Sequence, residues 1–312
     1  MVLHGCTQTA SGYDRSAGWS SAAEAHGFAL LFPEQQRANN PNLCFNWFSP
    51  EDARRQSGEA LSICQMIAAM HARHETDPNR VFVTGLSAGG AMAAVMLATY
   101  PDVFAGGAII AGLPYGTARS VPEAFDRMRG QGNAAPDALA ALVRSASGHK
   151  GPWPIVSVWQ GTKDTTVDPA NAQAIVDQWR IVHNAPQVPS RVETVNGNAH
   201  RVWRDANGRD VIEEYLISGM GHGTPLSTSA DGETEGPFML EAGISSTRET
   251  LKFWGIADRT EGSDLPSTHL VQAEPPRSEE PAPSVSSFSR RATSNGVQKT
   301  IDEALRAAGL LR

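Results

Sequence analysis

Short apolar runs alternate with longer stretches of mixed polarity along most of the chain. The runs are rich in Val, Ile, Leu and Phe, and their length is typical of parallel strands covered on both faces. We expect such strands at residues 2–3, 28–32, 80–84, 108–110 and 155–158. Helices are expected at residues 59–73 and 170–183, the latter with apolar positions at helical spacing. The alternation predicts an α/β fold, in which a mostly parallel central sheet carries helices on both faces.

Turn-forming residues mark a hairpin in the second half of the chain. Asn207-Gly208 lies between the apolar pairs Val202-Trp203 and Val211-Ile212, a pattern typical of a tight β-turn. Residues 113–150 are rich in Ala, Gly and Arg and separate two expected core strands. We expect helices there, which either shape a substrate pocket or simply cover the surface.

The composition changes after residue 257. Residues 1–257 are expected to form one catalytic domain, and residues 258–295 are rich in Pro, Ser, Glu and Thr, which predicts a disordered linker. In residues 296–312, apolar side chains fall on one face of a short helix. That helix either docks on a surface or is loosely attached.

One junction between a strand and a helix carries a candidate nucleophile. The apolar run that begins at Val81 leads into Gly85-Leu86-Ser87-Ala88-Gly89, and an Ala- and Met-rich helical stretch follows at once. In a G-x-S-x-G turn, the glycines let strand and helix approach closely around a serine exposed at the apex. An ordinary Gly-rich turn gives the same short motif, so Ser87 needs a base and an acid elsewhere in the chain.

A histidine and an aspartate each follow an apolar strand. The run that begins at Val211 ends in a Gly-rich loop holding His222, and a neutral imidazole is the natural general base near neutral pH. The strand at 155–158 leads to Asp164, which we expect to orient His222. Asp168 is the alternative acid, but Asp168-Pro169 is typical of the start of a helix. We expect His200 in a polar loop.

The order Ser87, Asp164, His222 along the chain is that of the α/β-hydrolases. In hydrolases of this fold, the loop after an early strand and the residue after the nucleophile donate backbone N–H groups to the oxyanion. Those places hold Cys6 and Ala88 here, which are therefore the expected donors. The sequence predicts a serine hydrolase that forms an acyl-enzyme and needs no cofactor.

Composition narrows the classes of partner. With 312 residues, of which 40% are hydrophobic, the chain has enough apolar material for one large domain. A net charge of −7 without a basic stripe argues against nucleic acid as a partner. No apolar run is long enough to cross a membrane, no signal peptide is visible, and the cysteines and histidines lack the spacing of a metal site.

Several longer stretches carry a resemblance to a known family. They read LHGCTQTA, FPEQ, CFNWF, VFVTGLSAGGAMAAVMLATYPDVFA, AGLPYG and GMGHG, within residues 2–254. In these stretches the chain resembles esterases of the poly(3-hydroxybutyrate) depolymerase type, a family similar to the feruloyl and acetylxylan esterases. The resemblance implies an α/β-hydrolase fold, hydrolysis of hydroxyalkanoate esters, and the roles already given to the candidate site residues.

Two features depart from the family pattern. The chain begins almost on the loop after its first strand, so either the sequence starts late or the sheet lacks its first strands at one edge. The segment after residue 257 is too short for the separate polymer-binding domain that polymer-degrading members often carry. Because many members are secreted, the resemblance implies an extracellular or periplasmic location, with the cytoplasm as the alternative.

The loops expected near the site hold two cysteines and several aromatic residues. Cys6 and Cys44 either form a disulfide that pins residues 39–48 beside the oxyanion donors or remain free thiols. Cys64, on the helix expected at 59–73, is interpreted as a buried apolar residue. Trp47 and Tyr115 are candidate walls of the substrate pocket, and packing against neighbours is the alternative for each.

The leading prediction is a serine esterase that acts on poly- or oligo-(3-hydroxybutyrate) or similar short aliphatic esters. A feruloyl or acetylxylan esterase is the alternative, distinguished by whether the pocket takes a flat aromatic acyl group. The second alternative is a non-catalytic member of the fold that binds a polyester or a carbohydrate. The expected partner is a small or polymeric ester, and neither nucleic acid nor a membrane.

Overall fold

A computed structural model of the chain describes residues 1–257. The predicted linker at 258–295 and the predicted terminal helix at 296–312 lie outside the described residues. No helix within the described part combines the length and apolar character that crossing a bilayer requires.

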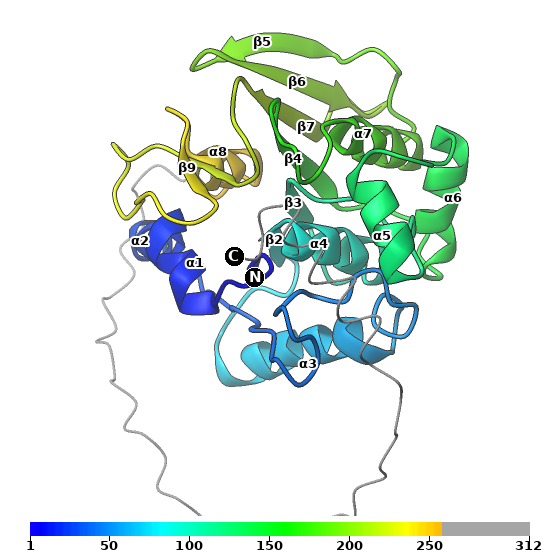
Figure 1. The fold of residues 1–312 in the computed structure, drawn as a ribbon, viewed down its shortest axis with the longest axis horizontal. Helices are drawn as coiled ribbons and strands as arrows, with labels where there is room; N and C mark the ends of the chain where they lie inside the picture. The colour runs from blue at the N-terminus through cyan, green and yellow to red at the C-terminus, as the bar shows by residue number, and fades with distance from the viewer. Residues whose placement is uncertain (258–312) are drawn as a thin grey trace, which may run out of the picture.

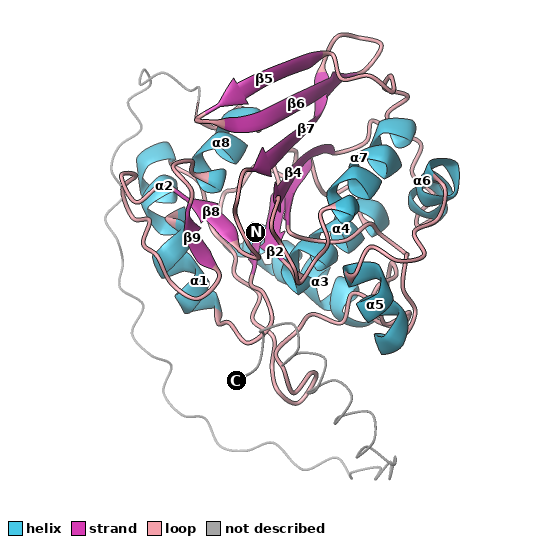
Figure 2. Ribbon diagram, turned by 45° about the horizontal axis from the view of Figure 1, so that its top comes forward, coloured by secondary structure: helices cyan, strands magenta, loops and turns pink. Residues whose placement is uncertain are grey.

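The central sheet is mixed but mostly parallel, as Figure 2 shows. Its strands, in spatial order, are β1 (Val2–Leu3), β2 (Phe82–Leu86), β3 (Gly106–Ile110), β4 (Ile155–Gly161), β7 (Asp210–Ile217), β6 (Asn198–Arg204) and β5 (Arg191–Val195). Strands β1 to β4 and β7 run parallel, whereas β6 and β5 are antiparallel to their neighbours. A separate parallel pair is formed by β8 (Thr224–Leu226) and β9 (Met239–Glu241).

Helices cover both faces of this sheet (Figure 1). One face carries α3 (Gly58–Arg73), α4 (Ala88–Thr99), α5 (Val121–Met128), α6 (Pro136–Ser145) and α7 (Ala170–Val182). The other face carries α1 (Ala10–Ala17), α2 (Trp19–His26) and α8 (Ser246–Phe253). The predicted α/β class with helices on both faces is confirmed.

Alternating side chains of the strands supply two separate apolar cores. In β3, Ile109 joins the core under α4 and α7, while Ala108 and Ile110 join the core under α2 and α8. Every residue of α4 is buried, because this helix is apolar on all sides and lies in the middle of its layer. The turn at residues 85–89, here called the elbow, is therefore anchored to a helix that is buried along its whole length.

The strand predicted at 28–32 is wrong. These residues have no strand conformation, and their one backbone hydrogen bond to β1 joins the amide of Val2 to the carbonyl of Leu31 at 2.9 Å. Phe28, Leu30 and Phe32 are partly buried against the core under α2 and α8. The run is apolar because it packs against the sheet, not because it pairs within it.

The predicted hairpin is confirmed, since β6 and β7 pair as antiparallel neighbours around Asn207-Gly208. Strand β5 extends the hairpin at the outer edge of the sheet and was not predicted. Four of the five β5 residues are exposed, so this strand lacks the apolar run that marks the others. It is held to β6 by backbone hydrogen bonds and by the contact between Glu193 and His200.

His200 belongs to a buried polar network, contrary to the expectation of a polar loop. It lies on β6, is 4% exposed, and stacks on the ring of Tyr215 with centroids 4.1 Å apart. Its Nδ1 contacts Glu193 Oε1 at 2.9 Å, and its Nε2 contacts Glu213 Oε2 at 3.1 Å. Ser157 on β4 donates a hydrogen bond to the second oxygen of Glu213 at 2.7 Å. The network thus ties the hairpin to the parallel strands.

The charges of this network depend on one another. Burial by itself lowers the pKa of His200, but hydrogen bonds and attraction from Glu213 and Glu193 outweigh it and raise that pKa. Burial also raises the pKa of Glu213. Without Glu213, the hydroxyl of Ser157 and Nε2 of His200 lose a hydrogen-bond partner, and a buried polar group left unpaired costs about 1–3 kcal/mol.

We therefore expect Glu213→Ala to lower the free energy of unfolding by about 2–4 kcal/mol near pH 6. Denaturant unfolding followed by circular dichroism measures this loss. The control is Glu24→Ala, which removes an exposed carboxylate on α2 and should shift the value by at most about 0.5 kcal/mol. Equal, small effects of both substitutions would contradict a stabilising role for the network.

Candidate active site

Ser87 lies at a sharp turn between β2 and α4. Its backbone has φ 57° and ψ −117°, a conformation that residues with a side chain rarely adopt. A Cβ built at Gly85 would collide with the backbone of Gly89, and one built at Gly89 would collide with the carbonyl groups of Leu3 and His4. These glycines therefore allow the close contact of β1, β2 and α4 that holds Ser87 in its strained geometry.

Asp164 and His222 are joined by a short hydrogen bond. His222 Nδ1 lies 2.7 Å from Asp164 Oδ2, and both side chains are almost completely buried. The amides of Thr166 and Val167 donate to the other carboxylate oxygen of Asp164, at 2.8 and 2.9 Å. Gln160 donates to Oδ2 at 3.0 Å. Asp164 is thus fixed by donors from its own turn and can hold one imidazole orientation.

The loop that carries His222 is bound to the loop after β4. A Cβ at Gly161 would collide with the carbonyl groups of Met220 and Gly221, so only glycine permits this approach. The amide of Lys163 donates to the carbonyl of Met220 at 2.9 Å. Asp168, the alternative acid, instead accepts a hydrogen bond from the amide of Ala170 at the start of α7. These contacts explain why Asp164 rather than Asp168 meets His222.

The parallel strands bring the three predicted residues to one edge of the sheet. Ser87, Asp164 and His222 all follow the carboxyl ends of parallel strands, which is where ligands bind in α/β sheets. His222 Nε2 is buried and has no hydrogen-bond partner among residues 1–257. No hydrogen bond therefore joins Ser87 to His222 here. Such bonds are often long without substrate and shorten only in the complex.

Two amides beside Ser87 have no acceptor. Within the described chain, neither the N–H of Cys6 nor that of Ala88 donates to a protein oxygen. Cys6 is held in place by a disulfide to Cys44, which confirms the disulfide hypothesis and excludes free thiols at these positions in this structure. Cys64 carries a free thiol and is only half-buried, so the expectation of full burial is not met.

A small cavity of about 60 Å³ opens onto Ser87. Its lining is mostly apolar and comes from the loop after β1, the loop before α3, the elbow and α5. The lining residues are Cys6, Asn40, Asn42, Cys44, Trp47, Phe48, Ser87, Ala88, Leu113, Val121, Ala124, Phe125, Met128 and Val167. Trp47 thus lies where a substrate wall was expected, and α5 covers the cavity. Helix α6 packs against α7 instead.

Tyr115 does not line this cavity. Its backbone N–H donates to the side chain of Gln178 at 2.9 Å, and its carbonyl accepts from the same side chain at 3.0 Å. The ring is half-buried and packs against the core under α4 and α7. Packing therefore explains Tyr115 in this structure.

A half-buried carboxylate that the sequence pattern did not single out holds the loop before α3. Glu59 accepts hydrogen bonds from Gln35 Nε2 at 2.5 Å, from Asn46 N at 2.7 Å and from Asn46 Nδ2 at 2.7 Å. Gln35 also donates through its backbone to His4 Nε2 at 3.1 Å and through its side chain to the carbonyl of Cys44. Glu59 therefore links the loop of Cys44 and Trp47 to the loop of Cys6. Acidic residues are common in the first turn of a helix, so the sequence carries no signal for this role.

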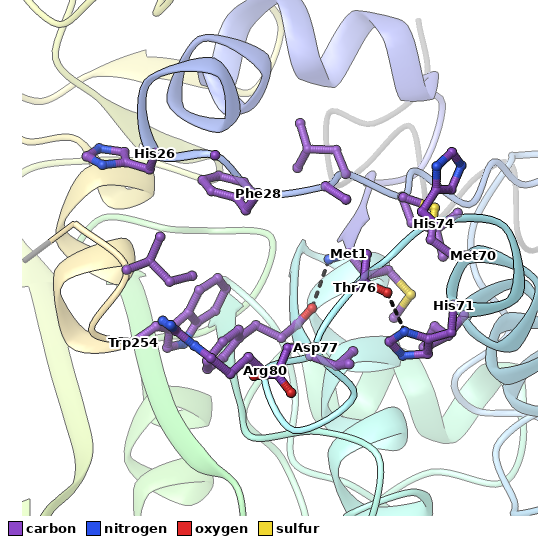
Figure 3. Close-up of a pocket in the computed structure, with 18 of the residues that line it drawn as sticks. Met1, His26, Phe28, Met70, His71, His74, Thr76, Asp77, Arg80 and Trp254 are labelled. Atoms are coloured by element: carbon purple, nitrogen blue, oxygen red, sulfur yellow. Dashed lines mark hydrogen bonds between the residues drawn. The ribbon is translucent and has the colours of Figure 1, made fainter. Parts of the chain in front are cut away.

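A second, larger cavity of about 650 Å³ lies at the opposite end of β2 from Ser87 (Figure 3). It is lined by Phe82, the first residue of β2, whose ring stacks on Trp254 with centroids 4.7 Å apart. His71 contacts Thr76 on its wall. None of the predicted site residues lines it. Size alone therefore does not mark the active site.

The described residues contain no group of three or more His, Cys, Asp or Glu side chains that could hold a metal ion.

The chain is similar to proteins of a known family. The model of the family described as "Esterase PHB depolymerase" matches residues 1–186. The chain belongs to this family. Poly(3-hydroxyalkanoate) depolymerase C of Paucimonas lemoignei is 47% identical over 260 residues, 82% of this chain and 63% of that protein. An acetylxylan esterase of Coprinopsis cinerea is 31% identical over 73% of this chain and 62% of its own length.

This member of the PHB depolymerase esterase family therefore spans less than two thirds of the length of these curated relatives. Among solved structures, the acetyl xylan esterase of Aspergillus awamori matches 82% of this chain and 87% of that chain, with a TM-score of 0.65 and 22% identity. This likeness supports the α/β-hydrolase fold alone.

Glu59 gives the site a pH-dependent component. Burial raises the pKa of Glu59 to about 7, against hydrogen bonds from Asn46 and Gln35 that lower it, and the charge of Asp52 adds to the rise. A carboxyl whose pKa is higher in the folded state stabilises the fold at low pH. That contribution is lost as the pH rises from about 4.5 to about 7.

We therefore expect the free energy of unfolding of the wild type to fall by about 2–3 kcal/mol, relative to that of Glu59→Gln, between about pH 4 and pH 8. Denaturant unfolding at both pH values, with each variant referred to wild type, gives this difference. The control is Glu24→Gln, the same substitution at an exposed position of α2. A pH-independent difference for Glu59→Gln would show that Glu59 titrates normally.

Proposed function

We propose that this chain is a serine ester hydrolase that cleaves short-chain aliphatic esters, including oligomers of 3-hydroxybutyrate. The observation that supports this most is the buried hydrogen bond of 2.7 Å between Asp164 and His222, at the same edge of the sheet as Ser87. Relatives in this family named as depolymerase and acetylxylan esterase support the same class of reaction.

In the proposed mechanism, Ser87 is the nucleophile, His222 is the general base and acid, and Asp164 orients His222. His222 Nε2 takes the proton of Ser87 Oγ while Oγ attacks the carbonyl carbon of the ester. Asp164 fixes the tautomer in which Nδ1 carries the proton, and it stabilises the imidazolium that forms. His222 then protonates the leaving alcohol, and water hydrolyses the acyl-enzyme with His222 again as the base.

The free amides of Cys6 and Ala88 are the proposed oxyanion donors. Both residues line the cavity at Ser87, and negative charge on the former carbonyl oxygen would provide the acceptor that these amides lack. The disulfide to Cys44 and the close contact at Gly89 hold the two donors without rearrangement. Such preorganised donors are typically the strongest electrostatic contribution to acyl transfer.

The size of the cavity favours short acyl groups. A volume of 60 Å³ has room for about four or five water-sized groups, far less than the several hundred Å³ of typical sites for larger ligands. This supports hydroxybutyryl or acetyl groups over a flat feruloyl group. An acetylxylan esterase is thus the second candidate function, favoured by the small cavity and by the Coprinopsis cinerea relative.

The location that we propose is extracellular or periplasmic. The disulfide between Cys6 and Cys44 supports it, because disulfides persist in oxidising compartments and are rare in the cytosol.

Replacing the nucleophile tests the reaction class. We expect Ser87→Ala to lower kcat for p-nitrophenyl butyrate by about 10⁴-fold or more, and Asp164→Asn to lower it by about 10⁴-fold because the wrong tautomer results. The absorbance of the released p-nitrophenolate at 400 nm gives both values. The control is Ser62→Ala, an exposed serine on α3, which should keep full activity. A folded wild type no faster than Ser87→Ala would contradict the proposal.

Enlarging the cavity tests the substrate class. We expect kcat/KM to be highest for acetyl and butyryl esters and to fall steeply for octanoyl esters and methyl ferulate. Met128→Ala shortens a side chain in the cavity wall and should raise the octanoyl-to-butyryl ratio by about tenfold, the worth of a few methylene groups. The control is Met66→Ala, a methionine on the exposed face of α3. An unchanged ratio in Met128→Ala would place the acyl group elsewhere.

A further inference from the structure

Besides Ser87, Asn42 is a polar side chain of the cavity that has no hydrogen-bond partner within residues 1–257. The residue is 7% exposed and lines the same cavity as Ser87. Among the described residues, its carboxamide makes no hydrogen bond, although its backbone does. The carbonyl of Asn42 accepts from Thr7 N at 2.8 Å, and its N–H donates to Asn40 Oδ1 at 2.9 Å.

The neighbouring asparagines of this loop behave differently. Asn40 donates through Nδ2 to Asn46 Oδ1 at 2.8 Å, and Asn46 donates through its own Nδ2 to Glu59 at 2.7 Å. Both carboxamides therefore hold the loop together. That of Asn42 contributes nothing to it. Neither of its polar atoms is among the fully buried unpaired atoms of residues 1–257, so water can reach the carboxamide in the empty cavity. A ligand in the cavity would displace this water and would have to replace its hydrogen bonds.

The position of Asn42 is also fixed in advance. Its backbone is bound to the residue that follows Cys6, and Cys6 and Cys44 flank it through the disulfide. The carboxamide is thus presented to the cavity from a loop that cannot easily move away. A rigid donor and acceptor in an apolar cavity is the usual way in which a small-molecule site fixes the orientation of its ligand.

We infer that Asn42 determines specificity by hydrogen bonding to the hydroxyl group on C3 of a 3-hydroxyacyl group bound next to Ser87. This inference rests on the proposed esterase function. A carboxamide both donates and accepts, so it can satisfy a hydroxyl in either direction. Most of the other lining residues are apolar, among them Leu113, Val121 and Phe125, and these suit the carbon chain.

The chemistry of the lining predicts discrimination between two acyl groups of the same carbon skeleton. A butyryl group in the cavity would exclude water from the carboxamide of Asn42 without replacing the lost hydrogen bonds. A 3-hydroxybutyryl group would supply them. Sites that hydrogen-bond a substrate hydroxyl discriminate strongly against the analogue that lacks it, because their own polar group is then left unpaired.

The test compares kcat/KM for p-nitrophenyl 3-hydroxybutyrate with that for p-nitrophenyl butyrate. Within one variant the ratio isolates the hydroxyl group, and comparison between variants cancels the intrinsic reactivity of the two esters. We expect the ratio to fall about tenfold or more in Asn42→Ala and in Asn42→Leu, the latter keeping a side chain of similar size. The matched control is Asn39→Ala, an asparagine of the same loop that does not line the cavity.

The outcomes separate this inference from the proposed function. A wild type that hydrolyses neither ester contradicts the esterase function itself. A wild type active on both, whose ratio is unchanged in both Asn42 variants, overturns the role of Asn42 and indicates that water satisfies the carboxamide. A fall in the ratio that is equal in Asn39→Ala would also overturn it, because the effect would then come from the loop as a whole.

Discussion

The close approach of three backbone segments around Ser87 is the constraint on which the rest of the site depends. Gly85 and Gly89 bring β1, β2 and the start of α4 into direct contact, and any side chain at either position would force them apart. The same contact sets the strained φ of Ser87 and the position of the Ala88 amide. Because α4 is buried along its whole length, the strain cannot relax by movement of the helix.

Around this rigid centre, the chain assembles the remaining groups through loops that are tied to one another. Gly161 lets the His222 loop approach the end of β4, just as Gly89 lets the start of α4 approach β1. Backbone amides of the turn after β4 hold Asp164. On the other side, the disulfide and Glu59 fix the loop that carries Asn42 and Trp47. The site is therefore built on loops, yet each loop is held in place by contacts with a strand, a helix or a second loop.

The sequence was informative where one segment alone determines the structure. Ser87, Asp164 and His222 each follow an apolar strand at a recognisable turn, and the hairpin at Asn207-Gly208 carries its own turn signal. The apolar run at 28–32 was misread because periodicity cannot distinguish packing against a sheet from pairing within it. The roles of Glu59 and Asn42 depend on contacts between loops far apart in sequence, which no local pattern reveals.

Covalent labelling tests the central claim, that Ser87 is an activated nucleophile, most directly. The chain is incubated with a fluorophosphonate, digested, and analysed by mass spectrometry to find the modified residue, with Ser62→Ala and His222→Ala treated in parallel. We expect one phosphonylated serine, Ser87, labelled rapidly in wild type and Ser62→Ala and at least about 10³-fold more slowly in His222→Ala. Labelling of another residue, or equal rates with and without His222, would contradict it.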